Sequence, residues 1–174
     1  MKPVALRPFE LSDIEFFRLI RSCPDFLQYL APPDSPSFVN ELQAFQRVNM
    51  FAEMARQGPW GPRVIYLIGP DRPIGICGLI PTENLPAPEL TAFLLKDFRG
   101  NGYCTEGVRI LLDHFRDLNY GAFVERCNVR SLALISRLRM MQKGEIHHPA
   151  LRRTGLWFEG LSSSTILSFE SVPY

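Results

Sequence analysis

Residues 89–106 read ELTAFLLKDFRGNGYCTE, and this stretch decides how the fold is interpreted. Its apolar first half predicts a strand over residues 89–95, and the apolar spacing from residue 102 onward predicts an amphipathic helix. The loop between them contains Gly100 and Gly102, which allow the backbone to approach a ligand closely. The N–H groups at the start of a helix have no partners within it and carry a partial positive charge. The loop and the helix start therefore predict an anion site, most naturally for phosphate, with Arg99 as an additional cation.

A second segment, Asn128-Val129-Arg130-Ser131, follows a predicted strand and begins a short predicted helix. Taken alone, each segment has an ordinary explanation. Arg-Gly-x-Gly occurs in tight strand-to-helix turns that bind nothing, and Asn128 is a good N-cap residue. Two nucleotide-binding motifs are absent, because no Gly-Lys-Ser/Thr follows the loop and Gly107 stands at the wrong step for G-x-G-x-x-G.

The two segments together resemble the GNAT superfamily of acetyl-CoA-dependent N-acetyltransferases, closest to the branch with the ribosomal-protein alanine N-acetyltransferases. In that family a strand leads into Arg-Gly-x-Gly-Tyr-x-Thr-Glu at a helix start, and a later strand ends in Asn-x-x-Ser before a second helix. Leu6-Arg7-Pro8 and residues 73–78 extend the resemblance upstream. It implies one domain over residues 1–174 with an α/β (α+β) fold. The expected architecture is a mixed, mostly antiparallel central sheet of about seven strands with helices on both faces.

The resemblance also implies an acetyl-CoA site and roles for its residues. In this family the first loop binds the coenzyme A pyrophosphate, and a strand N–H, here near Phe93 or Leu94, polarises the thioester carbonyl. Ser131 is the candidate acid for the leaving sulfur, and Glu89 is the candidate base. The expected cofactor-binding residues are Phe93, Leu94, Leu95, Arg99, Gly100, Asn101, Gly102, Tyr103, Cys104, Thr105 and Asn128.

Four residues at three places depart from the family pattern. Cys104 stands where a Gly or Ala is typical, Thr91-Ala92 where a Gly-Tyr pair is frequent, and Arg139 where a Gly is typical. Two alternatives therefore stay open. One is a GNAT-fold protein that binds coenzyme A without transferring an acetyl group. The other is an unrelated phosphate- or nucleotide-binding module that uses only the 99–104 loop.

Composition limits the partners and the compartment. The chain has 174 residues and a net charge of +1, which argues against nucleic acid or an anionic membrane as the main partner. The four cysteines form no C-x-x-C pair, so we expect free thiols and a cytoplasmic location. His147 and His148 are adjacent on a predicted strand and point to opposite faces, so we expect no metal site.

The acceptor is expected to be a primary amine, but the sequence gives conflicting signals about its class. Residues 21–37 carry Asp25 and Asp34, which suit a cationic amine, whereas residues 147–164 carry Arg152 and Arg153, which suit a carboxylate. A protein N-terminus, an amino acid, a polyamine and a small amine all stay open. The sequence does not determine the oligomeric state, although family analogy and the frequency of two-fold symmetry are consistent with a homodimer.

The remaining elements follow from local patterns. Ser12 and Glu15 form a capping-box pattern at the start of a first helix. The next helix is expected to carry Phe38, Leu42, Phe45 and Val48 on one face. Residues 64–68 and 74–80 predict a β-hairpin, and residues 140–146, 155–159 and 165–170 predict the final strands.

Overall fold

The computed structural model describes residues 3–160, which form a seven-stranded sheet with the order β1-β2-β3-β4-β5-β7-β6. The strands are β1 (Val4–Arg7), β2 (Gly61–Leu67), β3 (Arg72–Ile80), β4 (Glu89–Leu94), β5 (Gly121–Val124), β6 (Met141–His148) and β7 (Arg153–Glu159). Neighbouring strands are antiparallel except β4 and β5, which are parallel. The mixed, mostly antiparallel sheet predicted from the sequence is confirmed, as is the β2–β3 hairpin.

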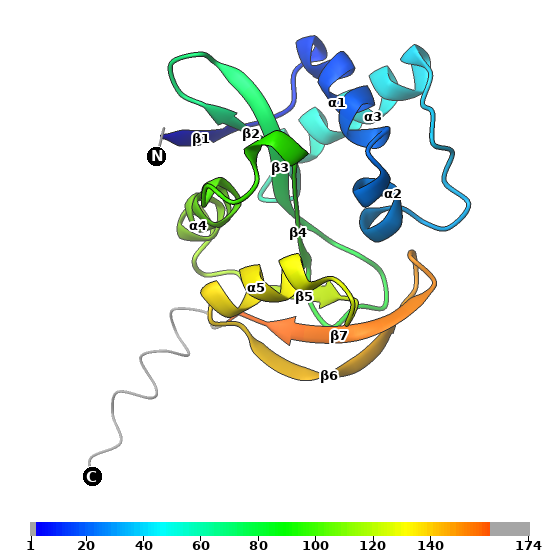
Figure 1. Ribbon diagram of the computed structural model, residues 1–174, viewed down its shortest axis with the longest axis vertical. Coiled ribbons are helices and arrows are strands. Elements are labelled where there is room, and N and C mark those ends of the chain that lie inside the picture. Colours follow the sequence, from blue (N-terminus) through cyan, green and yellow to red (C-terminus); the bar gives the residue numbers. More distant parts are fainter. Residues whose placement is uncertain (1–2, 161–174) are drawn as a thin grey trace.

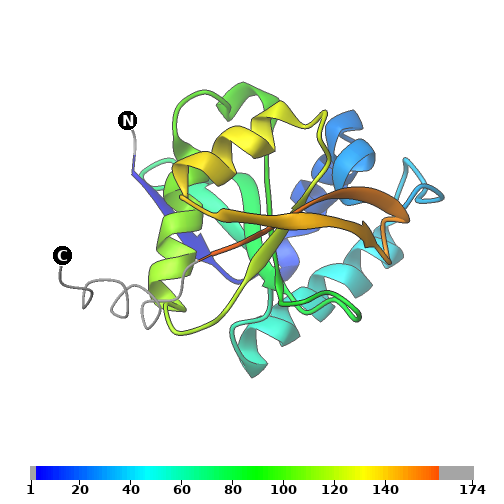
Figure 2. The ribbon, with the colours of Figure 1, turned by 90° about the horizontal axis from the view of Figure 1, so that it is seen from below.

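Helices cover both faces of the sheet, as expected (Figure 1). On one face lie α1 (Ile14–Arg21), α2 (Pro24–Leu30) and α3 (Glu41–Gln57), and on the other lie α4 (Tyr103–His114) and α5 (Val129–Arg137). Figure 2, seen from below, shows these two groups of helices on either side of the strands. Each group packs on its own apolar core. No helix in the described part of the chain combines the length and the apolar character needed to cross a membrane.

The side chains of β4 alternate between the two cores. Leu90 and Leu94 pack in the core beneath α4, together with Val108 and Leu111. Phe93 packs in the opposite core, beneath α1 to α3. Because successive strand residues point to opposite faces, Glu89 and Thr91 share the face of Phe93.

The sheet opens between β4 and β5. The two strands share one registered pair, Glu89 with Gly121, and the Gly121 N–H donates to Pro88 O at 3.0 Å. A Cβ atom at Gly121 would lie 2.0 Å from the Trp157 ring, so this position accepts only glycine without rearrangement. Beyond this pair the two parallel strands separate, and the space between them becomes available to a ligand.

The start of the chain differs from the sequence expectation in its helix boundaries. The first cap is made by Asp13 rather than Ser12, because the Glu10 N–H donates to Asp13 Oδ2 at 2.9 Å. Residues 11–13 form a 3-10 turn before α1. The short helix α2 was not expected, although Pro24 at its first position is a typical helix start.

The helix expected around residue 38 begins at Glu41 instead. Of the four residues expected on its apolar face, Val48 is fully buried, whereas Phe38 is 65% and Leu42 is 64% exposed. Phe45 is also exposed. The apolar spacing correctly predicted a helix in this region. The face of the helix that packs on the sheet is, however, centred on Ala44 and Val48.

The turn between α5 and β6 keeps its geometry without the glycine that the family pattern favours. Arg139 adopts a left-handed backbone with φ of 55°, which a glycine would adopt without strain. β6 then begins at Met141. The strand expected over residues 165–170 lies outside the described residues.

Candidate functional site

The gap between β4 and β5 leads into a cavity of about 610 Å³. Its walls come from α2, the end of β4, the loop before α4, the first turns of α4, and α5. The residues that line it are Asp25, Tyr29, Leu30, Ala92, Phe93, Leu94, Arg99, Gly100, Gly102, Cys104, Thr105, Glu106, Arg109, Asn128, Arg130, Ser131, Ala133, Leu134 and Arg137. The two segments that the sequence singled out, 99–105 and 128–131, therefore meet at one cavity.

The start of α4 presents free backbone donors to this cavity. Gly100 and Gly102 both have left-handed backbones, with φ of 81° and 77°. The first hydrogen bond of the helix runs from the Glu106 N–H to Gly102 O at 3.0 Å. The N–H groups of residues 103–105 precede this bond and have no partner within the helix. These donors and the helix dipole together suit a phosphate group.

Arginine side chains reinforce the positive character of the cavity. Arg99, Arg109, Arg130 and Arg137 border it, against the two carboxylates of Asp25 and Glu106. The sequence interpretation missed the last three of these arginines. A signal was available for two of them, because Arg130 and Arg137 are seven residues apart and so lie on the same side of α5.

The Arg99 guanidinium is engaged by protein groups rather than pointing freely at a phosphate position. Its Nε donates to Leu94 O at 2.9 Å, and its Nη1 forms an ion pair with Asp25. Arg130 reaches the same Asp25 carboxylate at 3.1 Å. The hydrogen bond from Arg99 is the main reason that the pKa of Asp25 lies below its usual value. Asp25 thus links α2 to both segments, 99–105 and 128–131, at the cavity.

The backbone direction in β4 identifies which N–H groups face the gap. The Leu95 N–H donates to Ile74 O at 2.9 Å and therefore points toward β3. Because N–H groups alternate along a strand, the Phe93 N–H also points toward β3, whereas the Leu94 and Ala92 N–H groups point away from it. Of the two donors proposed from the sequence, Leu94 has the orientation that the cavity requires.

Asn128 and Ser131 fit both interpretations of their segment, as the cap of a helix and as part of a ligand site. Asn128 Oδ1 accepts from the Ser131 N–H at 3.2 Å, so Asn128 caps α5 as its residue type predicts. Both residues also line the cavity. The cap orients the first turn of α5 so that its side chains border the cavity.

Cys104 lines the cavity at the position where the family pattern has a smaller residue. Burial raises the pKa of its thiol to about 11. The side chain is therefore an uncharged thiol at neutral pH, and its small size leaves room beside the glycines of the loop.

Three expected cofactor residues do not border the cavity, namely Leu95, Asn101 and Tyr103. Leu95 and Tyr103 pack against the two apolar cores. The Asn101 side chain donates to Arg99 O at 3.1 Å and supports the loop from outside. Their side chains shape the loop, and the N–H of Tyr103 belongs to the free helix start.

Glu89 lies at the opposite end of β4 from the phosphate loop, outside the cavity lining. Its side chain is mostly buried, and Oε2 lies 3.0 Å from His148 Nε2. Glu89 does not point into bulk solvent. It lies on the face of the sheet that bears Phe93, as strand alternation predicts, but it does not line the cavity.

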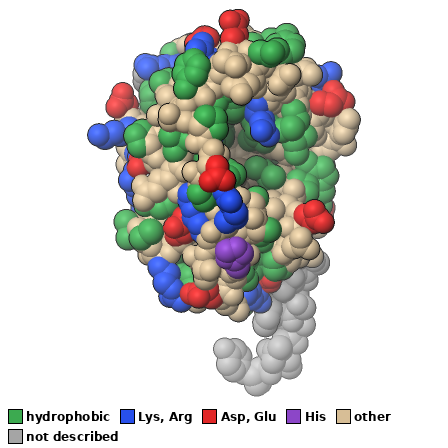
Figure 3. Space-filling model, turned by 90° about the vertical axis from the view of Figure 1, so that its right-hand side faces the viewer, with side chains coloured by type: hydrophobic (Ala, Val, Ile, Leu, Met, Phe, Trp, Pro, Cys, Tyr) green, Lys and Arg blue, Asp and Glu red, His purple; other side chains and the backbone are tan. Residues whose placement is uncertain are grey.

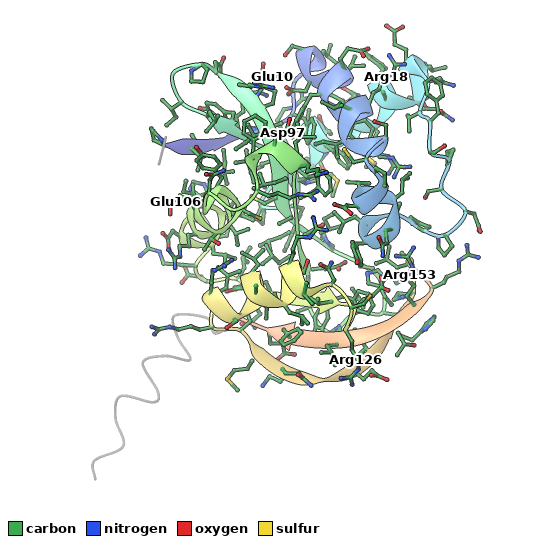
Figure 4. All side chains as sticks on the ribbon, viewed as in Figure 1. Glu10, Arg18, Asp97, Glu106, Arg126 and Arg153 are labelled. Carbon is green, nitrogen blue, oxygen red and sulfur yellow. The ribbon has the colours of Figure 1, made fainter. Side chains whose placement is uncertain are left out.

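Each of the four charges named for the expected acceptor region has an ion-pair partner, but only Asp34 and Arg152 pair with each other. Arg152 forms an ion pair with Asp34, and Arg153 pairs with Glu125 at 3.1 Å. Arg153 also donates to the carbonyls of Gln28 and Ala31 at the end of α2. Figure 4 shows Arg153 extending from β7 toward α2, and Figure 3 shows basic, acidic and histidine side chains gathered on this side of the molecule.

Comparison with known proteins agrees with this geometry. The sequence matches the family described as the acetyltransferase (GNAT) domain over residues 4–141. No curated protein sequence matches the chain. One similar solved structure is RimL, the ribosomal L7/L12 alpha-N-protein acetyltransferase, in complex with coenzyme A, with a TM-score of 0.76 and 14% identity over 91% of this chain and 93% of that chain.

Two further structures share the fold. The ribosomal-protein-S5-alanine acetyltransferase from Vibrio fischeri has a TM-score of 0.75 and 15% identity, covering 94% of this chain and 95% of that chain. The microcin C7 self immunity acetyltransferase MccE, in complex with acetyl-CoA and AMP, has a TM-score of 0.74 and 14% identity, covering 91% and 92%. With its family match, its opened sheet and the cavity at the start of α4, the chain belongs to the acetyltransferase (GNAT) family and is an acetyl-CoA-dependent N-acyltransferase.

Proposed function

We propose that this acyltransferase moves the acetyl group of acetyl-CoA directly to a primary amine that enters from the α2 side of the sheet. The observation that carries the proposal is the separation of β4 and β5 beyond Glu89 and Gly121. The cavity at this gap has walls from α4 and α5 and also from α2 and Phe93, which lie on the face of the sheet that bears Glu89. A thioester held in the gap is accessible to an amine from the other side.

The residues around the cavity fit coenzyme A by charge and by shape. The free N–H groups of residues 103–105 and the guanidinium groups of Arg109, Arg130 and Arg137 would hold its phosphates. Ala92, Leu134 and Phe93 provide apolar walls for the pantetheine arm. When bound, acetyl-CoA supplies the activated acetyl group.

The Leu94 N–H is the proposed donor to the thioester oxygen. It points into the gap between β4 and β5, because the Leu95 N–H beside it is bonded to β3. A fixed backbone donor stabilises the negative charge that develops on this oxygen when the amine attacks, and oxyanion donors of this kind are worth about 10²–10³-fold in rate.

Ser131 is the proposed acid for the leaving sulfur. Ser131 lines the cavity at the first turn of α5, and its own N–H is held by Asn128. A hydrogen bond from this hydroxyl stabilises the departing thiolate mainly after the carbon–sulfur bond has begun to break. Such an interaction contributes to kcat more than to the binding of acetyl-CoA.

Glu89 is the proposed base for the ammonium proton. It lies four residues before Phe93, which is about 13 Å along an extended strand, so the proton would reach it through water rather than directly. Thr91 lies between them on the same face, and its side chain is largely buried. A short path of water and the Thr91 hydroxyl would therefore connect the amine site to the Glu89 carboxylate.

The proposal is tested by incubating the protein with acetyl-CoA and a panel of amines that includes N-terminal peptides, amino acids and polyamines. Free thiol release and the mass of the acetylated product are measured. We expect turnover with at least one primary amine, a kcat loss in Ser131→Ala with an unchanged KM for acetyl-CoA, and a loss of about 10²-fold or more in Glu89→Gln. Tight acetyl-CoA binding without turnover across the panel would contradict the proposal and favour a coenzyme A-binding protein that does not transfer acetyl groups.

A further inference from the structure

His148 is a buried histidine at the end of β6, and its side chain is 3% exposed. Both of its ring nitrogens have partners. Nε2 lies 3.0 Å from Glu89 Oε2, and Nδ1 accepts a hydrogen bond from the Leu151 N–H at 3.1 Å. The imidazole also packs edge-to-face on Phe123, with ring centroids 5.0 Å apart.

These contacts determine where the imidazole carries its proton. A backbone N–H can only donate, so Nδ1 must be the unprotonated acceptor. The ring proton is then on Nε2, which donates to the Glu89 carboxylate. His148 is therefore a neutral imidazole with a fixed orientation, and its hydrogen bond holds one particular oxygen of Glu89.

The contact leaves the second oxygen of Glu89 available. Oε2 is the oxygen bonded to His148, and within residues 3–160 no hydrogen bond reaches Oε1. Arg153, in the β6–β7 hairpin that also carries His148, is hydrogen-bonded to Glu125 and to carbonyls of α2 rather than to Glu89. Glu89 thus has one anchored oxygen and one oxygen free to accept a proton.

We propose that His148 is a positioning residue that anchors Glu89 through Nε2, so that Oε1 faces the proton path from the amine. The inference rests on the proposed function, because it assumes that Glu89 is the base. It also connects the base to the β6–β7 turn, since Leu151 in that turn sets the orientation of the imidazole. Holding a base in its productive orientation is worth substantial rate, because small misplacements of a catalytic group are costly.

Two substitutions separate this role from a purely structural one. His148→Gln can place an amide N–H near the position of Nε2 and so keep a donor for Glu89. His148→Asn can place its oxygen near the position of Nδ1 and keep the bond from the Leu151 N–H, but it is too short to reach Glu89. Each variant therefore keeps one of the two hydrogen bonds of His148.

The experiment measures kcat, both KM values and the melting temperature for these variants and for Glu89→Gln, with the amine found in the panel. We expect His148→Asn to lose about 10-fold or more in kcat and His148→Gln to stay within about 3-fold, with KM for acetyl-CoA unchanged in both. In the double variant Glu89→Gln/His148→Asn, we expect no loss beyond that of Glu89→Gln. The opposite order, with His148→Asn active and His148→Gln impaired, would show that His148 only holds the turn.

The outcomes also distinguish this inference from the proposed function. If Glu89→Gln loses activity while His148→Asn keeps it, Glu89 stays the base and the positioning role is wrong. If Glu89→Gln keeps parent activity, both assignments are wrong. Nitrogen-15 NMR of the imidazole provides a reading independent of turnover and of the variants. We expect the Nε2–H tautomer in the parent protein, and the Nδ1–H tautomer would overturn the inference.

Discussion

Glu89 of β4 and Gly121 of β5 are registered neighbours, and beyond them the two parallel strands part. The same pair thus marks the closed end of the gap in the sheet and places the proposed base beside it. The position of Gly121 depends on the Trp157 ring of β7, which occupies the space where a side chain would lie. The end of the gap is therefore formed at a closely packed position of β5.

Gly121→Ala should destabilise the fold, because the added Cβ would lie 2.0 Å from the Trp157 ring. Overpacking of this kind costs about 1–3 kcal/mol, which urea denaturation would report as a lower midpoint. Gly58→Ala is the control, since its Cβ would meet Trp60 at an ordinary 3.8 Å. Equal stability of the two variants would contradict the packing described for β5.

Arg139→Gly should stabilise the protein by about 1 kcal/mol, because glycine adopts the left-handed backbone at this turn without strain. Arg139→Ala is the matched control, as it removes the same side chain but keeps the Cβ atom. A rise in melting temperature for the glycine variant alone is expected. If alanine stabilises equally, the effect comes from the side chain and not from the backbone.

The Cys104 thiol should make stability fall at alkaline pH. Its pKa is raised from 9.0 to about 11 by burial, so below pH 9 the thiol is protonated in both the folded and the unfolded chain. Between pH 9 and pH 11 the unfolded chain releases this proton first, and the free energy of unfolding decreases as pH rises. Denaturation at pH 8, 9 and 10 should show a smaller decrease in Cys104→Ala than in the parent. Parallel curves for the two proteins would contradict the burial of this thiol.

Arg137→Ala should weaken acetyl-CoA binding by several-fold, because Arg137 borders the cavity near the proposed phosphate positions. The effect should appear in KM for acetyl-CoA with little change in kcat, and it should shrink at high salt. Arg126→Ala is the control, since Arg126 is exposed and pairs with Glu145 away from the cavity. A similar KM for both variants would remove Arg137 from the cofactor site.

The sequence was sufficient to predict the helices and strands whose pattern depends only on neighbouring residues. α4 and the β2–β3 hairpin follow from apolar spacing and turn residues that lie within a few positions of one another. The helix α2 was missed because its seven residues lie between proline-rich stretches and are too few to establish a periodicity. The left-handed turn at Arg139 was also not readable, since its residue type does not favour that backbone.

In the candidate site, too, residues that are close in the sequence could be predicted, whereas contacts between distant residues could not. The loop over residues 99–105 could be proposed from the sequence because its residues are consecutive in the chain, and in the structure it borders the cavity. The contact between Glu89 and His148 joins residues 59 positions apart, and the bond between Arg152 and Asp34 joins residues 118 positions apart. Such pairs leave no periodic signal, so the sequence could not show that Asp34 and Arg152 of the acceptor region neutralise each other.

The central claim is that acetyl-CoA occupies the cavity between β4 and α5, and a blocking substitution tests it most directly. Ala133 lines this cavity, whereas Ser136 lies on the exposed side of the same helix, outside the cavity lining. Isothermal titration of acetyl-CoA should show binding at least about 100-fold weaker in Ala133→Trp, a loss of roughly 2.7 kcal/mol, and parent-like affinity in Ser136→Trp. Equal affinity of the two tryptophan variants, both folded by their melting temperatures, would contradict the account.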